Sequence, residues 1–130
     1  MIDMNEPLIA VVPLRAIKID PEERSIRVID IMPDAVAAAI HSDTTSTIDL
    51  DKDHCLVMDD GSHTAEHASR FRFTKGPLTR PFFGPVIILG SEHGNWKPAT
   101  LELAPLKAAI IWEKWDRAVQ DYAVHASGKS

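Results

Sequence analysis

The alternation of apolar and polar residues at the start of the chain predicts a β-hairpin. Residues 8–12 form a continuous apolar run, residues 15–19 alternate, and residues 25–31 return with a sequence rich in Ile and Val. Between the strands, Asp20 and Pro21 occupy the first two positions of a segment typical of a type I turn. We therefore expect a hairpin within residues 8–31.

The residues after this hairpin predict a short helix over positions 33–41. Pro33 suits the first turn of a helix, and the carboxylate of Asp34 complements the helix dipole. Val36 and Ile40 lie four residues apart, which places them on one face. We expect this helix to lie at an edge of the sheet.

Four later segments have the composition and alternation of strands. They are residues 47–50, 55–58, 70–73 and 82–89. The last of these is the most apolar segment of the chain, and it predicts the central strand of the sheet. Gly84 and Pro85 interrupt it near its start, which indicates a bulge or a late entry into the strand.

The C-terminal part of the sequence has the 3.6-residue periodicity of an amphipathic helix over residues 105–124. Its apolar face comprises Ala108, Ile111, Trp112, Trp115, Ala118, Val119, Tyr122 and Ala123. Leu106 and Ile110 fall on the polar side, so we expect them to contact a second layer or another copy of the chain in a homodimer. The combined pattern predicts an α+β fold of two layers, in which this long helix packs on a mostly antiparallel sheet.

Length and composition favour a single cytoplasmic domain spanning residues 1–130. The chain has one cysteine, Cys55, so no internal disulfide can form. Neither a signal peptide nor an apolar run of about 20 residues is visible, and we therefore expect no membrane association.

The net charge of the chain is −5, and its two halves differ. Residues 1–60 hold thirteen acidic residues against five Lys or Arg, whereas residues 61–130 hold six against nine. An acidic protein argues against non-specific binding of nucleic acid, because phosphate attraction needs a basic surface. It still allows a local basic site.

Two patterns suggest a metal site. The series Asp49, Asp51, Asp53 begins like a calcium loop, but the sixth position lacks glycine and the following residues form a strand pattern. We interpret it as an acidic turn. His63 and His67 have the spacing of zinc ligands on a helix, so a zinc-dependent enzyme using them is our alternative functional hypothesis. Exposed loop histidines are the simpler interpretation.

A run of basic residues in the second half of the chain is the strongest candidate binding site. Arg70, Arg72, Lys75 and Arg80 occur within eleven residues that contain no acid. The alternation of residues 70–73 places Phe71 and Phe73 on one face and the arginines on the other. We favour arginines that pair with the acidic first half of the chain, and the alternative is a site for an anionic small molecule, a nucleotide or an acidic protein surface.

The order of elements resembles a family of small uncharacterised proteins of bacteriophages, prophages and mobile elements. The residues that carry the resemblance are the hairpin from Arg15 to Ile31, the helix after Pro33, and the segments 56–60 and 83–90, and the likeness spans about residues 10–112. It implies an accessory role, as in a phage–host conflict, and no catalytic residue. The region past Trp112 and the histidine segment depart from the family.

These observations lead to one functional expectation. No nucleophile motif or phosphate-binding glycine loop is present. Cys55 lies in an apolar strand, where a thiol is inert. We expect a non-enzymatic accessory binding module, without a cofactor, that engages a protein partner or an anionic ligand through residues 70–80.

Overall fold

The computed structural model describes residues 12–60, 69–74, 78 and 80–114. Within them, β1 (Leu14–Asp20) and β2 (Ser25–Ile31) form the predicted hairpin, paired antiparallel along their whole length. The Asp20 carboxylate caps the turn by accepting the backbone N–H of Glu22 at 3.0 Å. The hairpin prediction is confirmed from Leu14 onward, and residues 8–11 lie outside the described part.

The hairpin belongs to a larger antiparallel sheet, called sheet A here. β3 (Thr45–Asp51) and β4 (His54–Asp59) form a second hairpin, and β7 (Val86–Glu92) lies between β1 and β4. The order is β2-β1-β7-β4-β3, and β8 (Asn95–Lys97) also pairs with β7. β7 is therefore the central strand, as its apolar sequence predicts, and residues 86–90 of it are buried.

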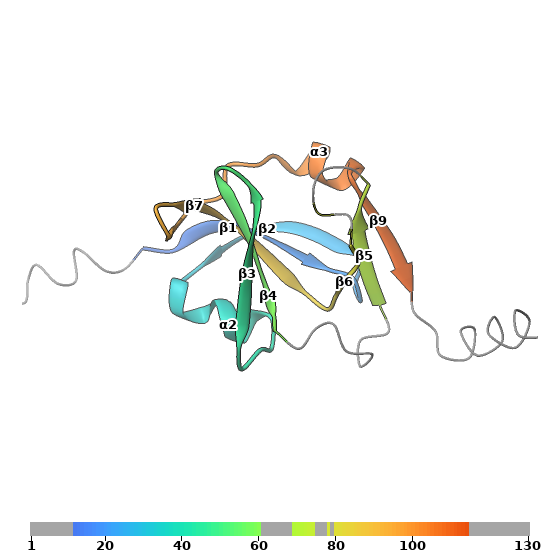
Figure 1. The fold of residues 1–130 in the computed structure, drawn as a ribbon, viewed down its shortest axis with the longest axis horizontal. Helices are drawn as coiled ribbons and strands as arrows, with labels where there is room; N and C mark the ends of the chain where they lie inside the picture. Colours follow the sequence, from blue (N-terminus) through green and yellow to red (C-terminus); the bar gives the residue numbers. More distant parts are fainter. Residues whose placement is uncertain (1–11, 61–68, 75–77, 79, 115–130) are drawn as a thin grey trace, which may run out of the picture.

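A smaller sheet, called sheet B, packs on one face of sheet A (Figure 1). It consists of β6 (Phe82–Phe83), β5 (Ser69–Phe73) and β9 (Ile110–Lys114), in that order. Gly84, whose φ of 78° is left-handed, and Pro85 separate β6 from β7. The apolar segment 82–89 is thus split between the two sheets.

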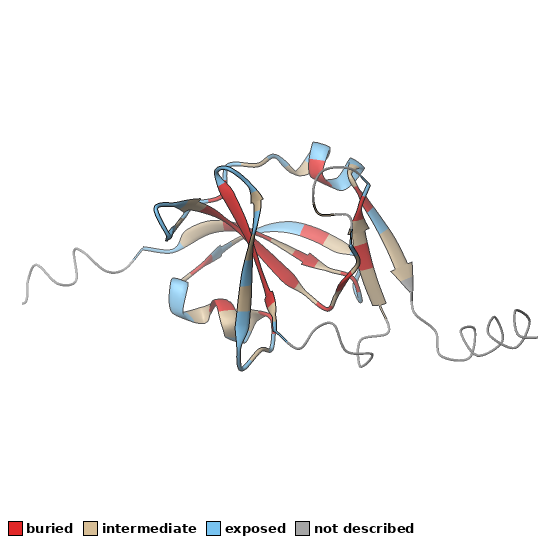
Figure 2. Ribbon diagram, viewed as in Figure 1, coloured by how far each residue is buried: buried red, intermediate tan, exposed pale blue. Residues whose placement is uncertain are grey.

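The core between the sheets is aromatic. Phe71 is fully buried there, and its ring lies 5.6 Å from that of Phe73, 5.3 Å from that of Phe82 and 6.3 Å from that of Trp112. Aliphatic side chains of β1, β4 and β7 form the other side of this core. Figure 2 shows the buried residues concentrated along these strands.

The predicted short helix covers the opposite face of sheet A and does not lie at an edge of the sheet, as the sequence led us to expect. It consists of a 3₁₀ turn, η2 (Pro33–Ala35), followed by α2 (Val36–Ala39). Val36 and Ile40 are both 2% exposed and belong to a second core with Ala16, Cys55, Val57, Ile87 and Leu89. Sheet A is therefore buried on both faces at its centre.

The prediction of a long C-terminal helix is wrong, and so is the α+β fold class that depended on this helix. In the described part of the predicted segment, the helix is limited to α3 (Leu103–Ala108), and the chain then continues as β9, which pairs with β5. Ile110 and Trp112 contact the inter-sheet core, and Ile111 is 46% exposed. The alternation of buried and exposed side chains from Ile110 to Trp112 is that of a strand. Pairing with β5 stabilises this strand over the helix that the 3.6-residue periodicity predicts. Residues 115–124 of the prediction lie outside the described part.

The structure decides between the two roles expected of Leu106 and Ile110 in favour of contact with a second layer. Leu106 and Ile110 are each only 8% exposed, because both side chains pack in the core between the sheets. They therefore cannot form an apolar surface for a second copy. In the described ranges, no helix has the length and apolar character needed to cross a membrane.

Candidate functional site

The predicted basic patch divides into paired and stacked arginines. Arg70 Nε donates a 2.8 Å hydrogen bond to Glu113 Oε1, and Arg72 Nη2 lies 3.4 Å from the same oxygen. Arg72 Nε lies 3.3 Å from Glu113 Oε2, at ion-pair distance but without a hydrogen-bond partner among the described residues. Two guanidinium groups thus share one carboxylate from β9, so the partner is not an acid of the first half of the chain as expected.

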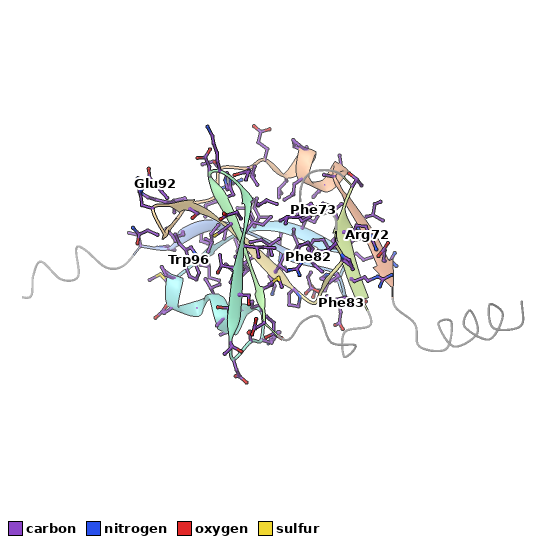
Figure 3. The ribbon with its side chains drawn as sticks, in the orientation of Figure 1. Arg72, Phe73, Phe82, Phe83, Glu92 and Trp96 are labelled. Carbon is purple, nitrogen blue, oxygen red and sulfur yellow. The ribbon has the colours of Figure 1, made fainter. Side chains whose placement is uncertain are left out.

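The remaining residues of this patch do not join the pair. Arg80 lies over the ring of Phe82, 5.1 Å from its centroid, and its Nη2 is 3.4 Å from Met58 Sδ. Lys75 lies outside the described residues. Figure 3 shows Arg72 on β5 at the outer side of sheet B, with Phe73 and Phe82 in the space between the sheets. The side chains of Arg70 and Arg72 therefore lie on the outer face of sheet B.

No metal centre is found in the part of the chain that the structure describes, where no three His, Cys, Asp or Glu side chains could hold an ion together. Asp49 and Asp51 belong to β3, and Asp53 lies in the turn before β4, so the acidic-turn interpretation holds for Asp53. His63 and His67 lie outside the described residues. The zinc hypothesis therefore stays a prediction.

His54 is a buried residue with polar contacts to two segments of the chain. It is 4% exposed, its Nδ1 lies 3.1 Å from Asp51 Oδ1, and its Nε2 accepts the backbone N–H of Thr100 at 3.0 Å. Because a backbone N–H can only donate, Nε2 is unprotonated and the ring proton sits on Nδ1, directed to Asp51. The imidazole thus ties the end of β3 to the segment before α3.

The Thr100 hydroxyl also lies 3.1 Å from His54 Nε2, which completes an Asp–His–hydroxyl series. The same order of groups activates the nucleophile in acyl-transfer enzymes. Here the single lone pair of Nε2 is already engaged by the Thr100 N–H, so it is not available as a base. The arrangement holds the chain in place and does not form a catalytic triad.

Cys55 lies in the second core, as its apolar strand predicts, and is 1% exposed. Burial raises the pKa of its thiol, and the Asp49 carboxylate raises it further, while hydrogen bonds involving Leu89 and Trp96 act in the opposite direction. A thiolate is therefore disfavoured at this position, and the thiol is unsuited to nucleophilic chemistry.

Two pockets flank α3, and the first is called the apolar pocket here. It has a volume of about 400 Å³ and lies between the β3–β4 turn, β5 and the segment from Thr100 to α3. Its lining residues are Leu50, Asp51, Phe73, Thr100, Leu101, Glu102, Pro105, Leu106 and Ala109. Apolar side chains form most of the wall, and the only charged side chains among these residues are two carboxylates.

The second is called the cationic pocket, and its volume is about 370 Å³. It lies where the turn end of β2 meets α3 and β9, and it is lined by Arg24, Ser25, Ile26, Lys107 and Trp112. Arg24 and Lys107 are exposed, and neither forms an ion pair within the described ranges. Two cations, a hydroxyl and an indole thus line one opening.

Sequence inspection missed both pockets. The cationic pocket combines residues 24–26 with residues 107 and 112, and the apolar pocket combines residues 50–51, 73 and 100–109. Neither set is close in sequence, so no local motif marks it. The one available signal was the basic excess of the second half of the chain, which includes Lys107.

Comparison of the chain with protein-family models, with curated proteins and with solved structures finds no match. The resemblance to a phage family therefore stays a prediction.

Proposed function

We propose that this protein is a non-enzymatic binding module that holds an anionic ligand with a flat ring in the cationic pocket. The observation that carries the proposal is the presence of Arg24 and Lys107 beside Trp112 in one opening of about 370 Å³. Pockets that bind small molecules span roughly 300–1,000 Å³, and a few polar groups fix the orientation of the ligand in them.

The charge of the pocket supports an anion. Arg24 and Lys107 lack ion-pair partners in the described part of the chain, whereas Arg70 and Arg72 share Glu113. A bound anion would therefore meet two positive charges that no carboxylate of the lining opposes. This moves the expected anion site from residues 70–80 to the junction of β2, α3 and β9.

Trp112 supports a ligand with a flat ring. Its indole packs at an angle of 67° against Phe71 in the core and also lines the pocket, so its position is fixed by packing. A ring stacked on such an indole gains affinity, and a base on an aromatic side chain contributes about 1–3 kcal/mol. An indole with two cations suits a nucleotide, one of the ligand classes that the sequence left open.

One nearby acid opposes this site. Ser25 Oγ donates a 3.4 Å hydrogen bond to Glu23 Oε1, so a carboxylate lies close to the pocket without lining it. A phosphate that accepts the Ser25 hydroxyl would have to displace this long bond. Replacing Glu23 with Gln should therefore tighten anion binding by a fewfold.

The accessory role implied by the phage resemblance is part of the proposal, and so is action within a phage–host conflict. A small domain that binds a nucleotide without converting it would either sense the nucleotide or lower its free concentration. A protein partner would then bind in response to the ligand.

Three matched probes test the proposal by isothermal titration calorimetry. Adenosine 5′-monophosphate has a ring and an anion, adenosine has the ring, and ribose 5-phosphate has the anion. We expect the monophosphate to bind at least about tenfold more tightly than either fragment. Equal affinity of the monophosphate and adenosine would contradict the role of the two cations.

Charge-reversal variants locate the site. Arg24→Glu with Lys107→Glu should abolish binding of the monophosphate, while Arg27→Glu, an exposed residue of β2, should leave it unchanged. The double variant Arg72→Glu with Arg80→Glu tests whether the monophosphate binds instead at the basic residues 70–80 predicted from the sequence. Loss of binding in that variant, with binding retained in the first, would overturn the assignment. Circular dichroism spectra verify that each variant is folded.

A further inference from the structure

We propose that the apolar pocket is a second ligand site, and that it takes a small organic cation with an apolar body. The wall is formed by side chains such as Leu50, Phe73 and Leu101, which would bury the body of the ligand. Asp51 and Glu102 supply the two charges among the lining residues, and both are negative. The pocket thus offers an apolar surface with anionic groups beside it.

Two contacts hold the Asp51 carboxylate in place beside the pocket. It accepts the backbone N–H of Asp53 at 2.8 Å and faces the Nδ1–H of His54 at 3.1 Å. Because these contacts already orient the carboxylate, little side-chain freedom is lost when a cation binds beside it. Glu102 is exposed at the N-terminal side of α3, where its carboxylate adds to the same field.

The wall of the pocket is fixed as well, although residues 98–102 form no regular element. Arg15 donates hydrogen bonds to the carbonyl oxygens of Ala99 at 2.7 Å and Leu101 at 3.1 Å. His54 holds Thr100 between them. The wall therefore needs no large rearrangement to receive a ligand, which favours binding.

The site is independent of the proposed function. α3 separates the two pockets: Lys107 lines the cationic pocket, whereas Pro105, Leu106 and Ala109 line the apolar one. Their charges have opposite signs, so they select opposite ligands. Failure of one site leaves the other assignment intact, because the probes and the variants differ.

Three probes with one phenyl body and different charges test this inference. They are 2-phenylethylamine, 2-phenylethanol and 3-phenylpropanoate, titrated into the folded chain and followed by ¹H–¹⁵N NMR. We expect the amine to bind with a dissociation constant of about 1 mM, some threefold to tenfold more tightly than the alcohol. The carboxylate should bind most weakly. Equal binding of all three, or no binding of the amine at about 20 mM, would overturn the proposal.

Two variants place the amine in the pocket. Glu102→Lys should weaken its binding by about fivefold or more, whereas Glu22→Lys, at an exposed position of the β1–β2 turn, should leave it unchanged. Ala109→Phe should block the pocket and remove binding altogether. If Ala109→Phe fails to fold, the comparison of Glu102→Lys with Glu22→Lys decides. Equal affinities of these two variants for the amine would place the amine elsewhere.

Discussion

Arg15 should be one of the largest polar contributors to the stability of this protein. It lies on β1, but its guanidinium reaches the carbonyl oxygens of Ala99 and Leu101, 84 and 86 residues further along the chain. Its backbone carbonyl also accepts the N–H of Ala99 at 2.7 Å. This one residue therefore ties sheet A to the segment that forms the wall of the apolar pocket.

We expect Arg15→Met to destabilise the fold by about 2–3 kcal/mol. Methionine keeps the apolar stem of the side chain and the backbone contact, and it loses two hydrogen bonds from a charged group, each worth roughly 1.5–3 kcal/mol. The two bonds share one partly buried guanidinium, so their energies do not add in full. Ala99 is 1% exposed, so water cannot readily replace the lost donor.

Thermal and urea unfolding followed by circular dichroism measure the effect. A loss of this size should lower the midpoint temperature by about 10 °C, given roughly 4 °C per kcal/mol for a chain of this length. Arg15→Lys should recover part of the loss, because an ammonium group can still donate to one carbonyl. Arg27→Met on the neighbouring strand, where the side chain is exposed, is the control. Equal midpoints for Arg15→Met and Arg27→Met would refute the reasoning.

Four further tests examine the packing of the chain. Gly90→Ala should destabilise by about 1–3 kcal/mol in urea unfolding, because the added Cβ would lie 2.5 Å from the Pro98 carbonyl oxygen, and an unchanged midpoint would contradict this contact. Phe71→Ala should cost about 3–5 kcal/mol in the same assay, since the ring is fully buried, and a loss below about 1 kcal/mol would show a loosely packed core. The Cys55 thiol should resist a disulfide reagent at pH 8 in the native protein and react in denaturant; rapid native reaction would disprove its burial. Because its folded pKa is raised, the stabilising contribution of Cys55 is complete below the unfolded value of about 8.5 and decreases as the pH rises above it, which urea midpoints between pH 7 and 10 would reveal.

Five strands of sheet A were predictable because each is marked by local chemistry, whereas β8 was not predicted. The 25–31 segment is rich in β-branched residues, Asp20 and Pro21 define the preceding turn, and the apolar run before Leu89 marks the central strand. These signals act over a few residues, so a single sequence contains them. The order of the strands depends on contacts between distant segments and could not be derived in this way.

The C-terminal region shows where local signals mislead. Ile111 and Trp112 fit the apolar face of a helix that leaves Ile110 on its polar side, whereas a strand directs Ile110 and Trp112 to the core. Pairing with β5 decides between the two, since Arg70 and Arg72 meet Glu113 and Phe71 meets Trp112 only in the strand. The sequence showed the arginines but not the strand that carries their partner.

The turn from α3 into β9 also determines both candidate sites. α3 is six residues long and ends at Ala108. The backbone N–H of Ala109 closes its last turn by donating to the carbonyl oxygens of Pro105 and Leu106. Trp112 then pairs with β5 and lines the cationic pocket, while Leu106 and Ala109 line the apolar one. A continuous helix would not pair Trp112 with β5 in this way. The feature that the sequence did not reveal is therefore the one that creates the two pockets, and a substitution that extends α3 should impair both ligand classes together.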